Sequence, residues 1–270
     1  LTQWNQELEA LNARMSRDLD AAAKIQQSLL PTTTPDLPQA SFAWKYLPCD
    51  ELAGDFLNLF PLDDRHVAAF VVDVSGHGVA SSLLSVTIGR VLTPQVSSSS
   101  LLVRQVDGAS QNRIVPPAEV AYEWNNRFPM EAQGQVDVTM VYGVLDLDAM
   151  EFRYVSAGHP AVVHQPRNGT PQLIEAADMA IGWVEDIEFE ERVIQLTAGD
   201  RLFLYSDGVP EAMDQELNEF GDQRMIDVIT AAKSEPLEEG VASLLNAVQK
   251  WCVKNGPKDD VSILAIQMES

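Results

Sequence analysis

The sequence predicts an α+β fold in which helices lie on antiparallel β-sheets. Apolar runs of strand length recur along most of the chain. Most of the segments that join them are short enough to be hairpins, which connect antiparallel neighbours. Runs with helical spacing stand apart from them, at residues 79–92 and again after residue 220. The chain has 270 residues, of which 46% are hydrophobic, so it can bury a substantial core.

A long helix is predicted at residues 1–30, because this segment contains neither glycine nor proline. Its apolar residues follow a three-and-four spacing that shifts by one position between Met15 and Leu19. Such a helix cannot bury its apolar stripe alone, so we expect it either to pack on its own domain or to pair with a partner helix. The stripe begins at Leu1, and we therefore expect the chain to be a fragment of a longer protein.

The remaining elements follow a linker that is rich in proline, at residues 31–38. Strands are predicted at residues 41–47, 55–60, 66–74, 136–147, 151–156, 161–165, 188–195, 201–206 and 260–268. Helices are predicted at residues 79–92, 118–128, 221–232 and 236–254. The polar segment 93–117 has few apolar residues to anchor it, and we expect a long mobile loop. Four tryptophans are expected in the core: Trp44, Trp124, Trp183 and Trp251.

Composition and charge argue against several classes of partner. The formal net charge of −22 repels nucleic acid and anionic lipid, so neither a nucleic acid nor a membrane is expected as a partner. No apolar run approaches the roughly 20 residues of a membrane span, and no signal peptide is visible. Cys49 and Cys252 are isolated, which indicates a reducing compartment and no zinc site. A cytoplasmic location is therefore expected.

Acidic residues stand at the ends of four apolar runs, each beside a glycine or a second aspartate. They are Asp55 in "AGDF", Asp73 in "VVDVSGHG", Asp207 in "LFLYSDGV", and Asp259 with Asp260 in "KDDVSILAI". One such aspartate is usually a helix cap or a turn residue, because a buried carboxylate is costly in a strand. Four at strand ends indicate a shared site. Carboxylates suit Mg²⁺ or Mn²⁺, and two such ions would polarise a phosphoryl group.

The motifs "GDF", "DVSGHG", "SAGHP", "YSDG" and "DDVS" occur in the order typical of the PPM, or type 2C, serine/threonine protein phosphatases. Together with "AAKIQQSLLP" at residues 22–31, they make the chain resemble the bacterial SpoIIE-like, stress-response branch. The resemblance covers residues 22–267. It implies a sandwich of two antiparallel sheets flanked by helices, with a phosphatase domain at residues 31–270. It also implies two Mn²⁺ or Mg²⁺ ions and hydrolysis of phosphoserine or phosphothreonine by water, without a phosphoenzyme.

The resemblance assigns roles to individual residues of these motifs. It implies catalytic metal ligands at Asp55, Asp73 and Asp207, with the backbone carbonyl of Val74 beside them. In "DDVS" the spacing to Ser262 favours Asp259 as a further catalytic ligand, and the adjacent Asp260 is the alternative. Asp73 would bridge both ions.

The same branch suggests a substrate and a means of regulation. The expected substrate is a small phosphorylated anti-sigma-factor antagonist. The helix at residues 1–30 resembles a linker from an upstream receiver or other sensor domain, as in two-component signalling, and it would pair in a homodimer. We expect the turn around Ile25–Leu29 to pass a change in helix pairing to the "AGDF" strand.

Three departures from the family pattern leave other interpretations open. Ala53, Asn58 and Pro210 stand where the family often has a glycine, an acidic residue and a threonine. A catalytically weak or inactive regulatory scaffold with the phosphatase fold is therefore the alternative, and a phosphatase for small phosphate esters is a third. His77 and His159 are expected to be structural rather than parts of a nucleophile–base pair, with a contact of His159 to the site left open.

Overall fold

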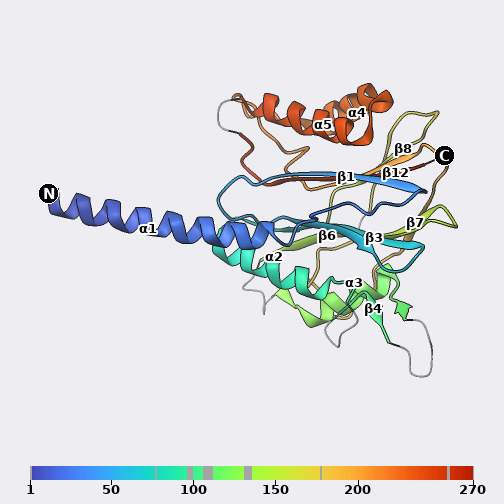
Figure 1. Ribbon diagram of the computed structural model, residues 1–270, viewed down its shortest axis with the longest axis horizontal. Coiled ribbons are helices and arrows are strands. Elements are labelled where there is room, and N and C mark those ends of the chain that lie inside the picture. Colours follow the sequence, from blue (N-terminus) through green and yellow to red (C-terminus); the bar gives the residue numbers. More distant parts are fainter. Residues whose placement is uncertain are drawn as a thin grey trace.

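The computed structural model describes residues 2–76, 78–95, 100–105, 112–130, 136–176, 178–253 and 256–269. It confirms a sandwich of two five-stranded antiparallel sheets with helices on both outer faces (Figure 1). In the view of Figure 1, helices α4 (Gly221–Ala231) and α5 (Leu237–Cys252) cover the upper sheet. Helices α2 (Val79–Val91) and α3 (Pro117–Arg127) lie below the lower sheet. A short 3₁₀ helix, η2 (Ala232–Ser234), joins α4 to the segment before α5.

In the upper sheet, the last strand of the chain lies between the first strand and β11 (Arg201–Tyr205). Its strands lie in the order β1 (Ala40–Leu47), β12 (Val261–Met268), β11, β8 (Val162–Gln165) and β9 (Gln172–Ile174). The helix α5 packs on β1 and β12 through one apolar face, on which Val241, Leu244 and Val248 are fully buried. This packing fixes the start of β12, where "DDVS" lies.

The lower sheet holds the most apolar strands. Its order is β10 (Arg192–Gln195), β7 (Glu151–Ala157), β6 (Val138–Asp146), β3 (His66–Val74) and β2 (Phe56–Pro61). The strand β3 has sheet neighbours on both edges, the other sheet on one face and α2 on the other, so nearly all of its side chains are buried. A strand that is covered on both faces reads as one continuous apolar run. Asp73 is the polar exception near its end.

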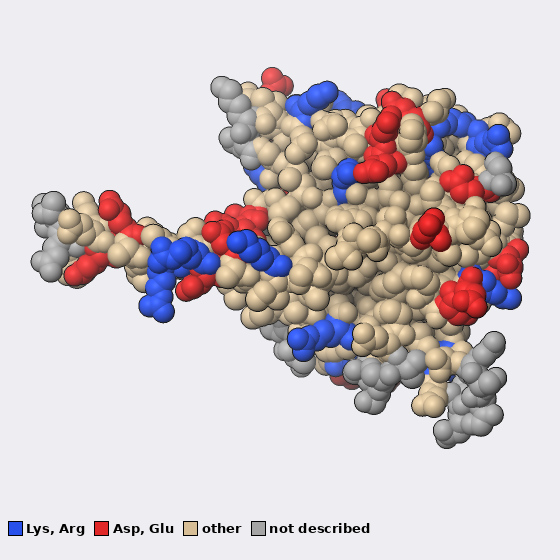
Figure 2. Space-filling model, in the orientation of Figure 1, with Lys and Arg blue, Asp and Glu red and all other residues tan. Residues whose placement is uncertain are grey.

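The first helix, α1 (Thr2–Gln27), projects away from the sandwich (Figure 1). Its apolar stripe is exposed there, by 78% at Trp4, 57% at Leu8 and 62% at Leu11. Both acidic and basic side chains lie along its length (Figure 2). This part of the helix therefore does not pack on its own domain, and only its last turn does. Within the described residues, no helix is both long and apolar enough to cross a membrane.

The segment 93–117 differs from the loop that we expected. In its described part, β4 (Val103–Arg104) pairs with β5 (Arg113–Ile114), and the side chains of Leu101, Leu102 and Val115 are fully buried. The prediction of few apolar anchors is thus wrong, because these three side chains join the core below the lower sheet. Residues 96–99 and 106–111 lie outside the described residues.

Two further predictions need correction. The strand expected at 188–195 begins only at Arg192, and the short strand β9 was not anticipated. Among the tryptophans, Trp124 is fully buried and Trp44 and Trp251 are partly buried, but Trp183 is 54% exposed. Trp183 lies in a turn after Gly182 and belongs to neither of the two hydrophobic clusters. Residue hydrophobicity alone was therefore a poor guide at this position.

Candidate metal centre

The four aspartate motifs meet at one end of the sandwich because of the sheet topology. In the lower sheet, β2 begins where β3 ends, with Phe56 opposite Val72. In the upper sheet, β12 begins where β11 ends, with Tyr205 opposite Ile263. Antiparallel pairing thus places the turns that carry the aspartates beside one another in pairs.

Two glycines allow these turns to approach more closely than other residues would. A Cβ atom at Gly54 would lie 2.2 Å from the carbonyl oxygen of Val74, and one at Gly208 would lie 2.0 Å from that of Asp260. Both distances are far below van der Waals contact, so each position requires glycine. The first contact brings the Val74 carbonyl against the turn that carries Asp55.

Asp260 is fixed by the backbone of another motif. Its Oδ1 accepts a hydrogen bond from the Cys49 N–H at 2.8 Å, and its Oδ2 accepts from the N–H groups of Gly54 at 2.7 Å and Asp55 at 3.3 Å. The residue is 2% exposed. By contrast, the adjacent Asp259 is exposed. The two neighbouring aspartates therefore have different environments, one holding the "AGDF" turn and one facing outward.

The carboxylates of this cluster oppose one another's ionisation. Burial, followed by the charges of Asp207 and Asp259, raises the pKa of Asp73 to about 8. Burial, followed by the charges of Asp259 and Glu211, raises the pKa of Asp207 to about 6. The pKa of Asp55 is also raised, by burial and then by Asp73 and Asp260. The pKa values are raised because the carboxyl groups lie close together in a poorly solvated site.

The residues present fit a divalent cation. Oδ2 of Asp55 is buried and has no hydrogen-bond partner within the described part of the chain. A cation would satisfy this oxygen and remove the repulsion among the carboxylates, and the oxygen-only donor set suits a hard ion. The Cys49 thiol lies beside Asp259 and Asp260, with ligand atoms within 4.8 Å of one another. Burial, followed by the charge of Asp260, raises the pKa of that thiol to about 12, so it is protonated at neutral pH and a poor ligand.

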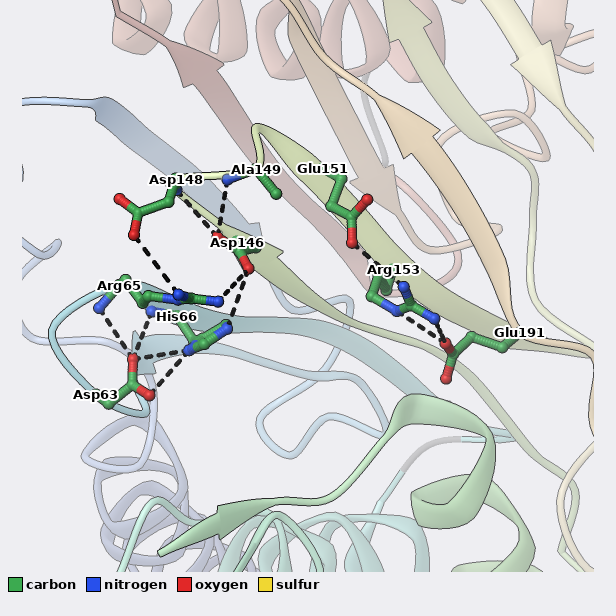
Figure 3. A network of polar contacts seen from close by, with 9 residues as sticks. All are labelled: Asp63, Arg65, His66, Asp146, Asp148, Ala149, Glu151, Arg153 and Glu191. Carbon is green, nitrogen blue, oxygen red and sulfur yellow. Dashed lines mark hydrogen bonds and ion pairs between the residues drawn. The ribbon is translucent and has the colours of Figure 1, made fainter. Parts of the chain in front are cut away.

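A second acidic network shows how a purely structural cluster differs. Figure 3 shows His66 between Asp63 and Asp146, at 2.9 Å and 3.3 Å, with Arg65 bonded to Asp146 at 2.9 Å. Burial opposes ionisation there too, but hydrogen bonds from the backbone and from His66 hold the pKa of Asp63 below its usual value. His66 begins β3 and Asp73 is its last residue but one, so about 23 Å of strand separates the two clusters. At Asp73 and Asp207, by contrast, the charged neighbours that shift the pKa are all acidic.

Sequence reasoning missed Gln26, which attaches α1 to the candidate centre. Its Nε2 donates to the Ala53 carbonyl at 2.7 Å and to Ser85 Oγ at 2.9 Å, and its Oε1 accepts from the Ala53 N–H at 3.2 Å. Asn58 makes a second link, because its Nδ2 donates to the Leu29 carbonyl at 2.9 Å. The departure from an acidic residue at position 58 thus has a structural role. No local pattern in the sequence marks Gln26, because its burial depends on its contacts with Ala53 and Ser85.

Glu211 was also missed, and the side-chain partner of His159 is Thr139 rather than an aspartate. The N–H of Glu211 donates to the Asp207 carbonyl at 2.9 Å, which brings its charge toward Asp73 and Asp207. His159 is buried, its Nδ1 lies 2.8 Å from Thr139 Oγ1, and burial lowers its pKa to about 3, so it is neutral. This contact is structural. His77 lies outside the described residues.

Solved structures identify the class to which this fold belongs. The chain superposes on the SiaA-PP2C domain of Pseudomonas aeruginosa with a TM-score of 0.76 at 20% identity, over 96% of this chain and 98% of that one. RsbX in complex with magnesium superposes with a TM-score of 0.60 at 13% identity, over 88% of this chain and 99% of that one. The fold is therefore the PP2C-type phosphatase fold.

The sequence narrows this class to a family. The family described as Stage II sporulation protein E (SpoIIE) matches residues 63–269, and the chain belongs to it. Phosphoserine phosphatase RsbP of Bacillus subtilis is 25% identical over 254 residues, which are 94% of this chain and 58% of RsbP. Phosphoserine phosphatase RsbU of the same organism is 25% identical over 77% of this chain and 58% of RsbU. The chain thus spans little more than half the length of these two relatives.

Proposed function

We propose that this chain is a metal-dependent protein serine/threonine phosphatase. The observation that carries the proposal is the cluster of Asp55, Asp73 and Asp207, whose pKa values are all raised. Within the described residues, the buried Oδ2 of Asp55 has no hydrogen-bond partner. Perturbed carboxylates of this kind are typical of functional sites. The cluster lies at the end of a PP2C-type fold, and relatives in the family are named phosphoserine phosphatases.

In this proposal two Mn²⁺ or Mg²⁺ ions are held by Asp55, Asp73, Asp207, Asp259 and the carbonyl of Val74. When bound, such ions polarise a phosphoryl group and lower the pKa of a water molecule. The chain supplies the positions of the ligands. The carboxylate of Asp260 accepts hydrogen bonds from backbone N–H groups of the turn that carries Asp55 and from Cys49. We therefore assign Asp259 as the metal ligand and keep Asp260 as the alternative. The Ser75–His77 region supplies no covalent nucleophile.

The proposed substrate is a phosphoserine or phosphothreonine in a partner regulatory protein. By the family resemblance, we take it to be a small anti-sigma-factor antagonist in the cytoplasm, acting in bacterial signal transduction. The net charge of −22 supports a protein partner over nucleic acid or an anionic membrane surface. Receiver or sensor domains in the rest of a longer protein would supply the signal.

The proposed domain organisation is a helical linker at residues 1–30 and a phosphatase domain at 31–270. Two copies would pair through the stripe of α1 that starts at Trp4, because this stripe is exposed and a single helix cannot bury it. The buried Gln26 supports a route for regulation, since it joins the last turn of α1 to the backbone of Ala53. This is the turn that precedes Asp55.

The dimer is tested by charge substitution on α1. Leu8→Glu with Leu11→Glu should convert a dimer into a monomer in light scattering and change the turnover. Gln6→Glu with Ala13→Glu is the matched control, because these positions lie on the opposite face of the helix. A wild-type chain that is monomeric at high micromolar concentration would contradict the dimer, and unchanged turnover in the monomer would contradict the link to catalysis.

The activity is tested with a phosphoserine peptide as substrate and Mn²⁺ as the metal. We expect phosphate release in Mn²⁺, none after EDTA, and recovery when Mn²⁺ is restored, while a phosphotyrosine peptide of the same sequence stays largely intact. Equal activity in EDTA would contradict the metal mechanism. No activity on any ester, with normal folding, would favour the alternative of an inactive regulatory scaffold.

A further inference from the structure

Trp183 is an exposed aromatic side chain that the surrounding structure holds in place. The residue is 54% exposed, yet its indole Nε1–H donates to Asp137 Oδ1 at 2.9 Å. The backbone on both sides is fixed by α3, because the Gly182 N–H donates to Asn125 Oδ1 at 2.7 Å and Asn125 Nδ2 donates to the Val184 carbonyl at 2.8 Å. Little conformational freedom would therefore be lost when another surface packs on this ring.

The ring is connected to the candidate metal centre through Asp137. The Ser75 N–H donates to the Asp137 carbonyl at 2.8 Å, and Ser75 Oγ accepts from the Asp137 N–H at 3.0 Å. Ser75 follows Asp73 by two residues, and Thr139 lies opposite Asp73 in the sheet. The path from Asp73 to the ring consists of two residues of extended chain, the pairing of Ser75 with Asp137, and the side chains of Asp137 and Trp183. It places the ring about 10–15 Å from Asp73.

The segment that carries Trp183 exposes both apolar and acidic side chains. Met179 and Val184 in the same segment are 47% and 46% exposed. The exposed residues that follow include Glu185, Asp186 and Glu188. A partner that covers this surface would need an apolar side chain for the ring and basic side chains for the carboxylates.

We propose that Trp183, with Met179 and Val184, binds an apolar residue of the phosphorylated partner protein, close in its chain to the phosphoserine and flanked by Lys or Arg. This inference rests on the proposed phosphatase function and names the substrate chemistry that the same site selects. An extended segment rises about 3.3 Å per residue, so the apolar residue lies about three to five positions from the phosphoserine. Trp183 is thus a specificity residue and takes no part in the chemistry at the carboxylates.

The test uses the full chain with Mn²⁺ and a series of lysine-containing phosphoserine peptides in which one leucine is moved through every position. The wild type should prefer leucine about three to five positions to one side of the phosphoserine. Trp183→Ala should abolish this preference and lower kcat/KM on the best peptide by at least about tenfold, because aromatic residues that become buried in a complex contribute strongly to binding. Hydrolysis of p-nitrophenyl phosphate should stay unchanged. Val193→Ala, an exposed apolar residue on β10, is the matched control and should behave as wild type.

Trp183→Phe separates docking from a role through Asp137, because it keeps an aromatic ring and removes the indole N–H. Docking predicts that Trp183→Phe retains the leucine preference. Loss of p-nitrophenyl phosphate hydrolysis in both variants would overturn the proposal in favour of a structural role, and so would wild-type kinetics of Trp183→Ala on every peptide. A drop in self-association of Trp183→Ala would instead assign this surface to a second copy of the chain and would also overturn the proposal.

Calorimetric binding of the leucine peptides distinguishes this proposal from the proposed function. Tight binding that depends on Trp183, with no hydrolysis by the wild type, would support the docking surface and contradict the phosphatase. Hydrolysis by the wild type without a leucine preference in binding or kcat/KM would support the phosphatase and overturn the docking surface.

Discussion

The substitution Asp73→Asn should stabilise the metal-free protein. The pKa of Asp73 is raised from 3.8 to about 8 by burial and by its acidic neighbours. At neutral pH the folded state must therefore either take up a proton at Asp73 or hold a buried charge, and both cost free energy. Asparagine has nearly the same shape and no charge. Replacing Asp73 thus removes both the repulsion and the desolvation of a carboxylate.

The size of the effect follows from the pKa difference. A displacement of about four pH units corresponds to an upper limit of about 6 kcal/mol. Because water and side-chain movement relieve part of this cost, we expect a gain of about 2–4 kcal/mol, or roughly 4–12 °C in Tm for a chain of this size. Between pH 3.8 and 8 the folded state holds a proton that the unfolded chain has released, so the wild type loses stability as the pH rises through this window. The advantage of Asp73→Asn should therefore be small at pH 5 and largest above pH 8.

Calorimetric unfolding in EDTA at pH 5, 6.5 and 8.5 measures this difference. The control is Asp64→Asn, which removes one charge from an exposed turn at the other end of β3. Excess Mn²⁺ should reverse the order, because the ion stabilises only the chain that binds it. An Asp73→Asn variant that is no more stable than the wild type at pH 8.5 would refute the reasoning, and so would an equal gain at every pH.

Four further substitutions test the parts of the centre. Asp259→Asn should weaken Mn²⁺ binding and leave Tm nearly unchanged. Asp260→Asn should instead lower the free energy of unfolding in urea by about 2–4 kcal/mol, because buried N–H groups lose a charged acceptor. Equal effects of the two substitutions would contradict the different roles of these aspartates. Gly54→Ala should abolish Mn²⁺-dependent hydrolysis, since its Cβ meets the Val74 carbonyl, and normal kcat would contradict the close approach. Gln26→Ala should lower kcat and cost about 1–3 kcal/mol by leaving the Ala53 backbone unpaired, and an unchanged kcat would remove α1 from the catalytic account.

Much of the fold was predictable because its strongest signals are local. The run at 66–74 predicted β3 with its observed bounds, since a strand covered on both faces is apolar at nearly every position. Prolines and glycines marked most of the turns, and hairpin-sized connections predicted antiparallel sheets. The aspartates at strand ends were found for the same reason, because each interrupts an apolar run.

The features that were missed depend on contacts between distant residues. The distinction between Asp259 and Asp260 rests on which carboxylate meets the Cys49 and Gly54 N–H groups, which no local pattern encodes. Gln26 is polar, and its burial follows only from its fit against Ala53. The prediction for Trp183 failed for the opposite reason. A large apolar side chain suggests a core residue, but Trp183 lies in a turn where it is exposed.

Calorimetric titration of the metal-free chain with Mn²⁺ tests the central claim, that the aspartates at this end of the sandwich form a divalent cation site. The wild type and Asp64→Asn should each bind about two ions per chain, the number that a phosphatase of this class would use. Asp73→Asn and Asp207→Asn should lose this binding while remaining folded. Wild-type stoichiometry and affinity in both variants would show that the ions bind elsewhere and would contradict the account.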